Sequence, residues 1–139
     1  MGIYTMRFHL EGFSSTFGGE FDDTMKNDTG LSLYEPHEAD QRPDLFYGVK
    51  DGNLLTPTWK RLITNSLYCA IRYDKTLPRK DLQKTLIQIT AKESGKQCFA
   101  WLVDWGPGNF DRVVDISQGV QSCLNICDED VVFIDYEFY

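Results

Sequence analysis

Three aspartates stand where a side chain could do acid or base chemistry. Asp104 ends the β-prone run Gln97–Val103 and is followed by a Trp-Gly-Pro turn, so we expect it at an abrupt strand end. Asp115 comes eleven residues later, in a second acidic turn ahead of a predicted helix, and Asp74 ends an earlier β-prone run. Carboxylates brought by neighbouring loops to one surface groove are what acid-catalysed cleavage of a glycosidic bond requires.

The expected surroundings suggest a role for each acid. Asp104 adjoins the apolar ring of Trp105, so loss of water would raise its pKa and keep it protonated as a general acid. Asp74 or Asp115 would stay ionised and stabilise positive charge or act as a base. An alternative without catalysis stays open, because an aspartate in a tight turn binds backbone amides and one before a helix caps it.

Side chains next to these acids are candidates for substrate binding. Tyr73 and Trp105 flank them and could stack on sugar rings, although aromatic residues at strand edges also serve as ordinary barrel cover. Arg72 and Arg112 are candidates to contact acidic groups of a glycan. We expect no metal site and no cofactor, because the calcium-loop pattern is absent and the cysteines lack zinc-site spacing.

The elements that must position these residues are mostly strands. The runs before and after Ser94 and Gly95 alternate in side-chain direction, which predicts a hairpin. We expect strands over residues 4–17, 67–74, 85–90, 97–104 and 131–138.

Two segments favour helices. Ser117 is a good N-cap for a helix whose apolar residues recur at helical spacing up to Cys127. Thr56 and Pro57 are typical of the start of another short helix, which we expect to run through Ile63. Residues 20–55 are polar and acidic without periodicity, and we expect a long loop there.

Length and composition limit the class of protein. With 139 residues we expect one domain over residues 1–139, and 42% apolar and 14% aromatic residues in alternating runs indicate a mainly β chain. The net charge of −7, without a basic stripe, argues against a general nucleic-acid binder. No apolar run approaches the roughly 20 residues of a membrane span. The first residues lack an apolar core followed by small residues, so we do not expect them to be a signal peptide.

The four cysteines leave their redox state open. If all were oxidised, Cys69, Cys98, Cys123 and Cys127 would allow three pairings. Buried free thiols in a reduced compartment are the simpler expectation. One cross-strand disulfide between Cys69 and Cys98 remains an alternative.

Several short motifs, in the correct order, resemble the double-psi β-barrel of the rare lipoprotein A family. Asp104–Pro107 resembles that family's Asp-Arg-Gly-Pro, Arg112–Ser117 its Ile-Asp-Leu-Ser helix start, and Asp74–Pro78 its His-Lys-Thr-Leu-Pro. Ser15–Gly19 is similar to the Thr-Phe-Tyr-Gly segment of expansins, barwin-like relatives on the same barrel. The resemblance covers residues 67 to 137 well and the first strand weakly, while residues 20–60 do not match.

This resemblance implies a mainly β fold, a six-stranded double-psi β-barrel with one or two short helices and a long amino-terminal loop insertion. It implies a lytic transglycosylase or glycosidase acting on peptidoglycan, with Asp104 at the family's turn aspartate and Asp74 at its catalytic histidine. In expansins and related endoglucanases the key acid falls at Asp115. Thr16 lies in the expansin-like segment and is a further candidate for substrate binding.

Two other functions stay open beside cleavage. An expansin-like protein would bind and loosen a wall polysaccharide in the same groove without cutting it. A structural assembly protein, such as a phage virion component, would instead use the loop Glu20–Asp51 as a contact surface for a protein partner. The acidic charge favours this second alternative, since wall polymers are often anionic. Without a signal peptide, a virion-associated or exported setting is consistent with each.

Overall fold

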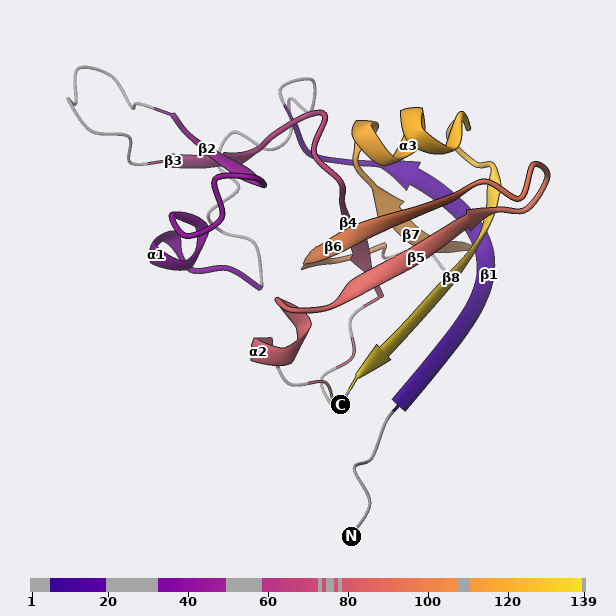
Figure 1. Ribbon diagram of the computed structural model, residues 1–139, viewed down its shortest axis with the longest axis horizontal. Helices are drawn as coiled ribbons and strands as arrows, with labels where there is room; N and C mark the ends of the chain where they lie inside the picture. Colours follow the sequence, from indigo (N-terminus) through magenta and orange to yellow (C-terminus); the bar gives the residue numbers. More distant parts are fainter. Residues whose placement is uncertain are drawn as a thin grey trace, which may run out of the picture.

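The computed structural model describes residues 6–19, 33–49, 59–72, 74, 77, 79–107 and 111–138. Its centre is a closed barrel with the strand order β1-β7-β4-β6-β5-β8 (Figure 1). The strands are β1 (Met6–Thr16), β4 (Tyr68–Ile71), β5 (Leu86–Ala91), β6 (Gln97–Trp105), β7 (Arg112–Ile116) and β8 (Val131–Phe138). The predicted mainly β class and six-stranded barrel are confirmed.

The barrel combines parallel and antiparallel pairs in a symmetric pattern. β1 pairs with β7 and β4 with β6 in parallel, while the other neighbours are antiparallel. Exchanging β1, β4 and β5 with β6, β7 and β8, in that order, leaves every pairing unchanged. The barrel therefore consists of two equivalent three-stranded halves. Parallel neighbouring strands need long connections. Residues far apart in the chain therefore lie side by side in the two parallel pairs.

The central hairpin and the last helix form where the sequence predicts them. β5 and β6 pair around a turn in which Gly95 has a φ of 77°, a conformation that favours glycine. The helix α3 (Gln118–Leu124) begins after Ser117, whose Oγ accepts a hydrogen bond from the Val120 amide at 3.1 Å. Its buried residues Val120 and Leu124 face the barrel, where α3 contacts β6 and β7.

A small second sheet lies beside the barrel and corrects two expectations. β2 (Phe46–Val49) pairs antiparallel with β3 (Trp59–Leu62), and α1 (Pro36–Ala39) precedes them (Figure 1). The helix expected up to Ile63 is therefore wrong over β3, and the loop expected over residues 20–55 is wrong over α1 and β2. Thr56 and Pro57 lie outside the described residues. β3 has only four residues, with apolar side chains at its two ends. That is too short for periodicity to distinguish strand from helix, and here pairing with β2 decides.

Arg42 joins this small sheet to the barrel. Its guanidinium donates hydrogen bonds of 3.0 and 2.9 Å to the carboxylate of Asp44, which hold the pKa of Asp44 below its usual value. The same guanidinium lies 4.6 Å from the centre of the Trp101 ring on β6. Next to α2 (Arg79–Leu82), Gln83 adds a 3.0 Å hydrogen bond to the carboxylate of Glu38 near α1.

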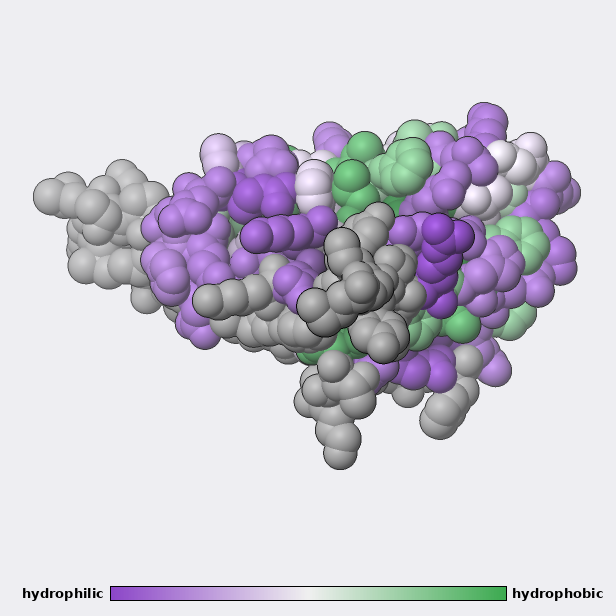
Figure 2. Space-filling model, turned by 60° about the horizontal axis from the view of Figure 1, so that its bottom comes forward, coloured by the Kyte–Doolittle hydropathy of each residue, from purple (hydrophilic) through white to green (hydrophobic). Residues whose placement is uncertain are grey.

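Alternate strand residues fill the barrel interior. Ile87 and Ile89 of β5 and Val132 and Ile134 of β8 are fully buried, as their alternation predicts. The face shown in Figure 2 is largely hydrophilic, with apolar residues in separate areas. Among the described residues, no helix has the length and apolar character needed to cross a membrane.

All four cysteines are free thiols. Cys69 and Cys98 are buried, in agreement with the expectation of unpaired apolar packing, whereas Cys123 and Cys127 are exposed. Burial, together with the neighbouring Cys123 of α3, raises the pKa of Cys98 to about 12. The alternative disulfide between Cys69 and Cys98 is not formed, because both thiols are free.

Candidate functional site

Asp104 and Asp115 lie on either side of Ala70. The short strand β4 places Ala70 opposite Asp104 of β6 and also opposite Asp115 of β7. Directly opposite residues face the same side of a sheet, and two strand spacings put the two aspartate backbones about 10 Å apart. Ala70, which lies between the two aspartates, has only a methyl group as its side chain. The two carboxylates can therefore approach each other above it.

A buried hydroxyl extends this row to a fourth strand. Ser15 of β1 stands opposite Asp115, is 8% exposed, and donates a hydrogen bond from its Oγ to the Asp115 carboxylate. The row Ser15, Asp115, Ala70 and Asp104 lies on the side of its strands that points away from the core, since the next residue of β7, Ile116, belongs to the core. Ser15 and Ala70 are nonetheless buried. Sequence reasoning did not select Ser15, and its separation of 100 positions from Asp115 gives no local signal.

The turn after Asp104 folds against Asp115. The Gly106 amide donates to the Ile71 carbonyl at 2.7 Å, and a Cβ at Gly106 would lie 2.8 Å from Oδ2 of Asp115. Only glycine allows so close an approach of the backbone. The Oδ1 of Asp104 accepts the Trp105 amide at 2.7 Å, so Asp104 also has the turn-forming role that was the alternative to catalysis.

Burial acts on Asp115 and raises the pKa of its carboxyl above the usual value. The Ser15 hydrogen bond and the Arg112 guanidinium lower this pKa, and the charge of Asp104 raises it. The sequence led us to expect the desolvated acid at Asp104. The structure shows this desolvation at Asp115, which lies on β7 with Gly106 packed close to its carboxylate. The raised pKa expected for Asp104 stays a prediction.

Two expectations about Asp115 are corrected by its position. It lies within β7 and not in a turn. Ser117, two residues later, is the N-cap of α3, so Asp115 is not a helix cap. The candidate acid is therefore fixed by strand pairing on both sides, which is a more rigid support than a loop.

The two candidate arginines lie at the same end of the barrel as the acids. Arg112 begins β7, and its Nη2 lies 3.3 Å from the Glu129 carboxylate. Arg72 follows β4 directly, and its Nη2 donates to the Arg112 carbonyl at 3.0 Å. Both line a small cavity of about 190 Å³. None of the four row residues lines this cavity, but the charge of Arg112 lowers the pKa of Asp115.

The remaining candidates have other surroundings. Asp74 is half-buried, and its charge contributes to raising the pKa of Tyr136 on β8. It follows the end of β4 and has no position in the strand register of the row. Trp105 is half-buried and packs against the core. Thr16 donates from Oγ1 to the Asp128 carboxylate at 3.2 Å. Tyr73 lies outside the described residues.

The arrangement offers a half-buried carboxyl group, a second carboxylate two strands away and a nearby guanidinium. In the described part of the chain, no group of three or more His, Cys, Asp or Glu residues is placed to hold a metal ion. The side chains of the row are of the types that supply a proton and stabilise developing positive charge. Comparison with known proteins finds no protein-family model that matches this chain and no curated protein that matches it significantly.

Proposed function

We propose that this protein is a double-psi β-barrel that binds a cell-wall polysaccharide, peptidoglycan being the expected one, and cleaves it by aspartate acid catalysis. The observation that carries the proposal is the position of Asp104 and Asp115 on either side of Ala70, with burial acting on Asp115. The two equivalent halves of the barrel and its two parallel strand pairs support the double-psi assignment.

In this mechanism Asp115 is the general acid. Its raised pKa favours the protonated form, which gives its proton to the oxygen of the leaving sugar as the glycosidic bond breaks. Asp104 faces the positive charge that develops at the anomeric carbon. A carboxylate then accepts the proton of the attacking hydroxyl group. In hydrolysis this group belongs to water, and in transglycosylation it is a hydroxyl of the sugar itself. Arg72 and Arg112 contact acidic groups of the glycan.

Binding without cleavage is a second candidate function, favoured by one observation. Both acids already have hydrogen-bond donors within the protein, the Trp105 amide for Asp104 and the Ser15 hydroxyl for Asp115. Carboxylates held in this way are also suited to accept hydrogen bonds from sugar hydroxyls. In that case the row would be the floor of an expansin-like binding groove.

Digestion of purified peptidoglycan tests the proposal. We expect soluble fragments, identified by mass spectrometry, whose anhydro or reducing ends distinguish transglycosylation from hydrolysis. Asp115→Asn should reduce their release by at least about 100-fold, the usual contribution of a general acid. Asp40→Asn is the matched control, because Asp40 pairs with Lys60 beside the small sheet. Binding of peptidoglycan without any release by the wild-type protein would leave only the second candidate.

A further inference from the structure

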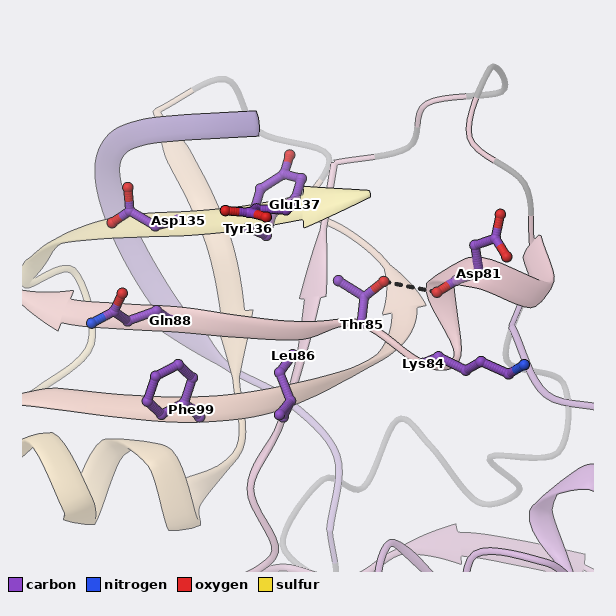
Figure 3. A pocket seen from close by; sticks show the side chains of 9 residues that line it. All are labelled: Asp81, Lys84, Thr85, Leu86, Gln88, Phe99, Asp135, Tyr136 and Glu137. Carbon is purple, nitrogen blue, oxygen red and sulfur yellow. Dashed lines mark hydrogen bonds between the residues drawn. The ribbon is translucent and has the colours of Figure 1, made fainter. Parts of the chain in front are cut away.

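A second hollow lies on the part of the barrel formed by β6, β5 and β8, and no residue of β4 or β7 lines it. This cavity of about 520 Å³ is bordered by these three strands and by the segment after α2 (Figure 3). Two of its lining residues are exposed apolar side chains, Phe99 at 55% and Leu86 at 43%. A volume of this size is within the usual range of small-ligand sites.

Strand register sets the polar groups of the hollow beside its aromatic ring. Gln88 of β5 stands opposite Phe99 of β6 on one side and opposite Asp135 of β8 on the other. Directly opposite side chains lie about 5 Å apart at Cβ. Figure 3 shows these three side chains on the same face of three adjacent strands. An aromatic platform, an amide and a carboxylate are thus fixed in one line by the backbone.

The carboxylates of the hollow already have basic neighbours. Asp135 contacts Nδ1 of His9, and Glu137 lies 3.2 Å from Nε of Arg7. An incoming cation would have to compete with His9 and Arg7 for these oxygens. An incoming anion would be repelled by the negative charges of Asp81, Asp135 and Glu137. The basic residue of the lining that could attract it is Lys84. The lining is therefore best matched by an uncharged ligand that has both an apolar face and hydroxyl groups.

We propose that this hollow binds neutral sugar units of a polysaccharide, with a pyranose ring against Phe99 and its hydroxyl groups on Gln88, Asp135 and Glu137. The C–H face of a sugar ring supplies the apolar surface, and aromatic rings with a few placed polar groups are the usual lining of such sites. The inference rests on the proposed function for its choice of polymer. It assigns the barrel a second contact with the chain that the aspartates would cleave.

Two separate contacts on one barrel have a measurable consequence. A long polymer can reach both, and the second contact becomes intramolecular, which raises overall affinity without a new kind of interaction. An oligosaccharide shorter than the separation of the two sites reaches only one of them. Loss of the hollow should therefore weaken binding to the polymer and leave cleavage of a short oligosaccharide by the aspartates unchanged.

Titration of the ¹⁵N-labelled protein with cellotetraose and with tetra-N-acetylchitotetraose tests the inference. We expect at least one of the two to shift the amide signals of Leu86, Gln88 and Phe99. Phe99→Ala should weaken this binding about tenfold, roughly the 1.4 kcal/mol that an aromatic contact supplies. Tyr47→Ala is the matched control, since Tyr47 is 37% exposed on β2 and outside the hollow.

Three results would overturn the inference. They are the absence of shifts in the hollow with both sugars, equal affinity of Phe99→Ala and wild type, and tighter binding of anionic tetragalacturonate at the same amides. Circular dichroism of Phe99→Ala verifies the fold, which this exposed side chain should not alter. Asp115→Asn separates the two proposals, because it removes cleavage and leaves the titration intact. Shifts in the hollow without cleavage by the wild type would contradict the proposed function alone, and cleavage without shifts would contradict this inference alone.

Discussion

Ser15 of β1 donates a hydrogen bond to the carboxylate of Asp115 on β7, although the two residues lie 100 positions apart in the chain. The parallel pairing of β1 with β7 sets them directly opposite each other. Ser15 is buried and Asp115 half-buried, so the hydroxyl contacts the carboxylate where water is largely excluded. This contact tunes the candidate acid from a strand at the other end of the chain.

Ser15→Ala should raise the pKa of Asp115. The Ser15 hydroxyl stabilises the ionised form of Asp115 and so lowers its pKa. Without it, burial and the charge of Asp104, which both raise the pKa, have less to offset them. The titration of the Asp115 carboxyl carbon, followed by ¹³C NMR, measures the change. Ser14→Ala is the control, because the Ser14 hydroxyl donates to the Asp130 carbonyl at 3.1 Å. An unchanged or lowered Asp115 pKa in Ser15→Ala would show that the hydroxyl does not act on the acid.

Asp115→Asn should stabilise the protein at neutral pH. Folding raises the pKa of Asp115, so the folded state holds its proton to higher pH than the unfolded state. Stability is lost as pH rises from the unfolded pKa through the folded one, and an amide avoids this loss. The gain should be at most about 1 kcal/mol, because partial exposure screens the effect. Urea unfolding should show the gain at pH 7 and not at pH 3, and a gain equal at both would contradict the assignment.

Ala70→Val should disturb the pair of acids in addition to destabilising the fold. Ala70 is 2% exposed and stands between Asp104 and Asp115, so two added methyl groups must push the carboxylates apart. Overpacking should cost about 1–3 kcal/mol in urea unfolding. Ala100→Val is matched in burial, since Ala100 is fully buried on β6. The control should lose similar stability and keep the Asp115 titration, whereas identical titrations in both variants would remove Ala70 as the spacer.

Arg42→Ala should loosen the small sheet from the barrel. The change removes two hydrogen bonds to Asp44 and the contact with the Trp101 ring, together worth about 1–2 kcal/mol. Hydrogen exchange should accelerate in β2 and β3 before it does so in β5. Arg7→Ala is the comparison, because the Arg7 side chain is 79% exposed and its ion pair should contribute less than about 1 kcal/mol. Uniform acceleration across β2, β3 and β5 would mean that Arg42 does not act locally.

Local patterns in the sequence were enough for several elements. Alternation of apolar residues predicts β5, β6 and β8, because a strand with one face in the core has a period of two. Ser117 predicts the start of α3, because an N-cap acts on amides within its own first turn. Each of these signals depends on residues that are neighbours in the chain.

The small sheet shows where local patterns fail. β3 is only four residues long, and at that length apolar spacing does not distinguish a strand from a helix. Its partner β2 belongs to a segment without visible periodicity. The choice between the two periods was made by pairing across a connection, a relation that no single stretch of sequence contains.

What the sequence by itself determined is a mainly β chain with a hairpin, a capped helix and acids at the ends of β-prone runs. Only the tertiary structure decided that Asp104 and Asp115 flank Ala70 and that Ser15 contacts Asp115. The physical reason is register. Closing a barrel with parallel pairs brings distant residues to the same level, and a shift of one position would turn each side chain to the opposite face.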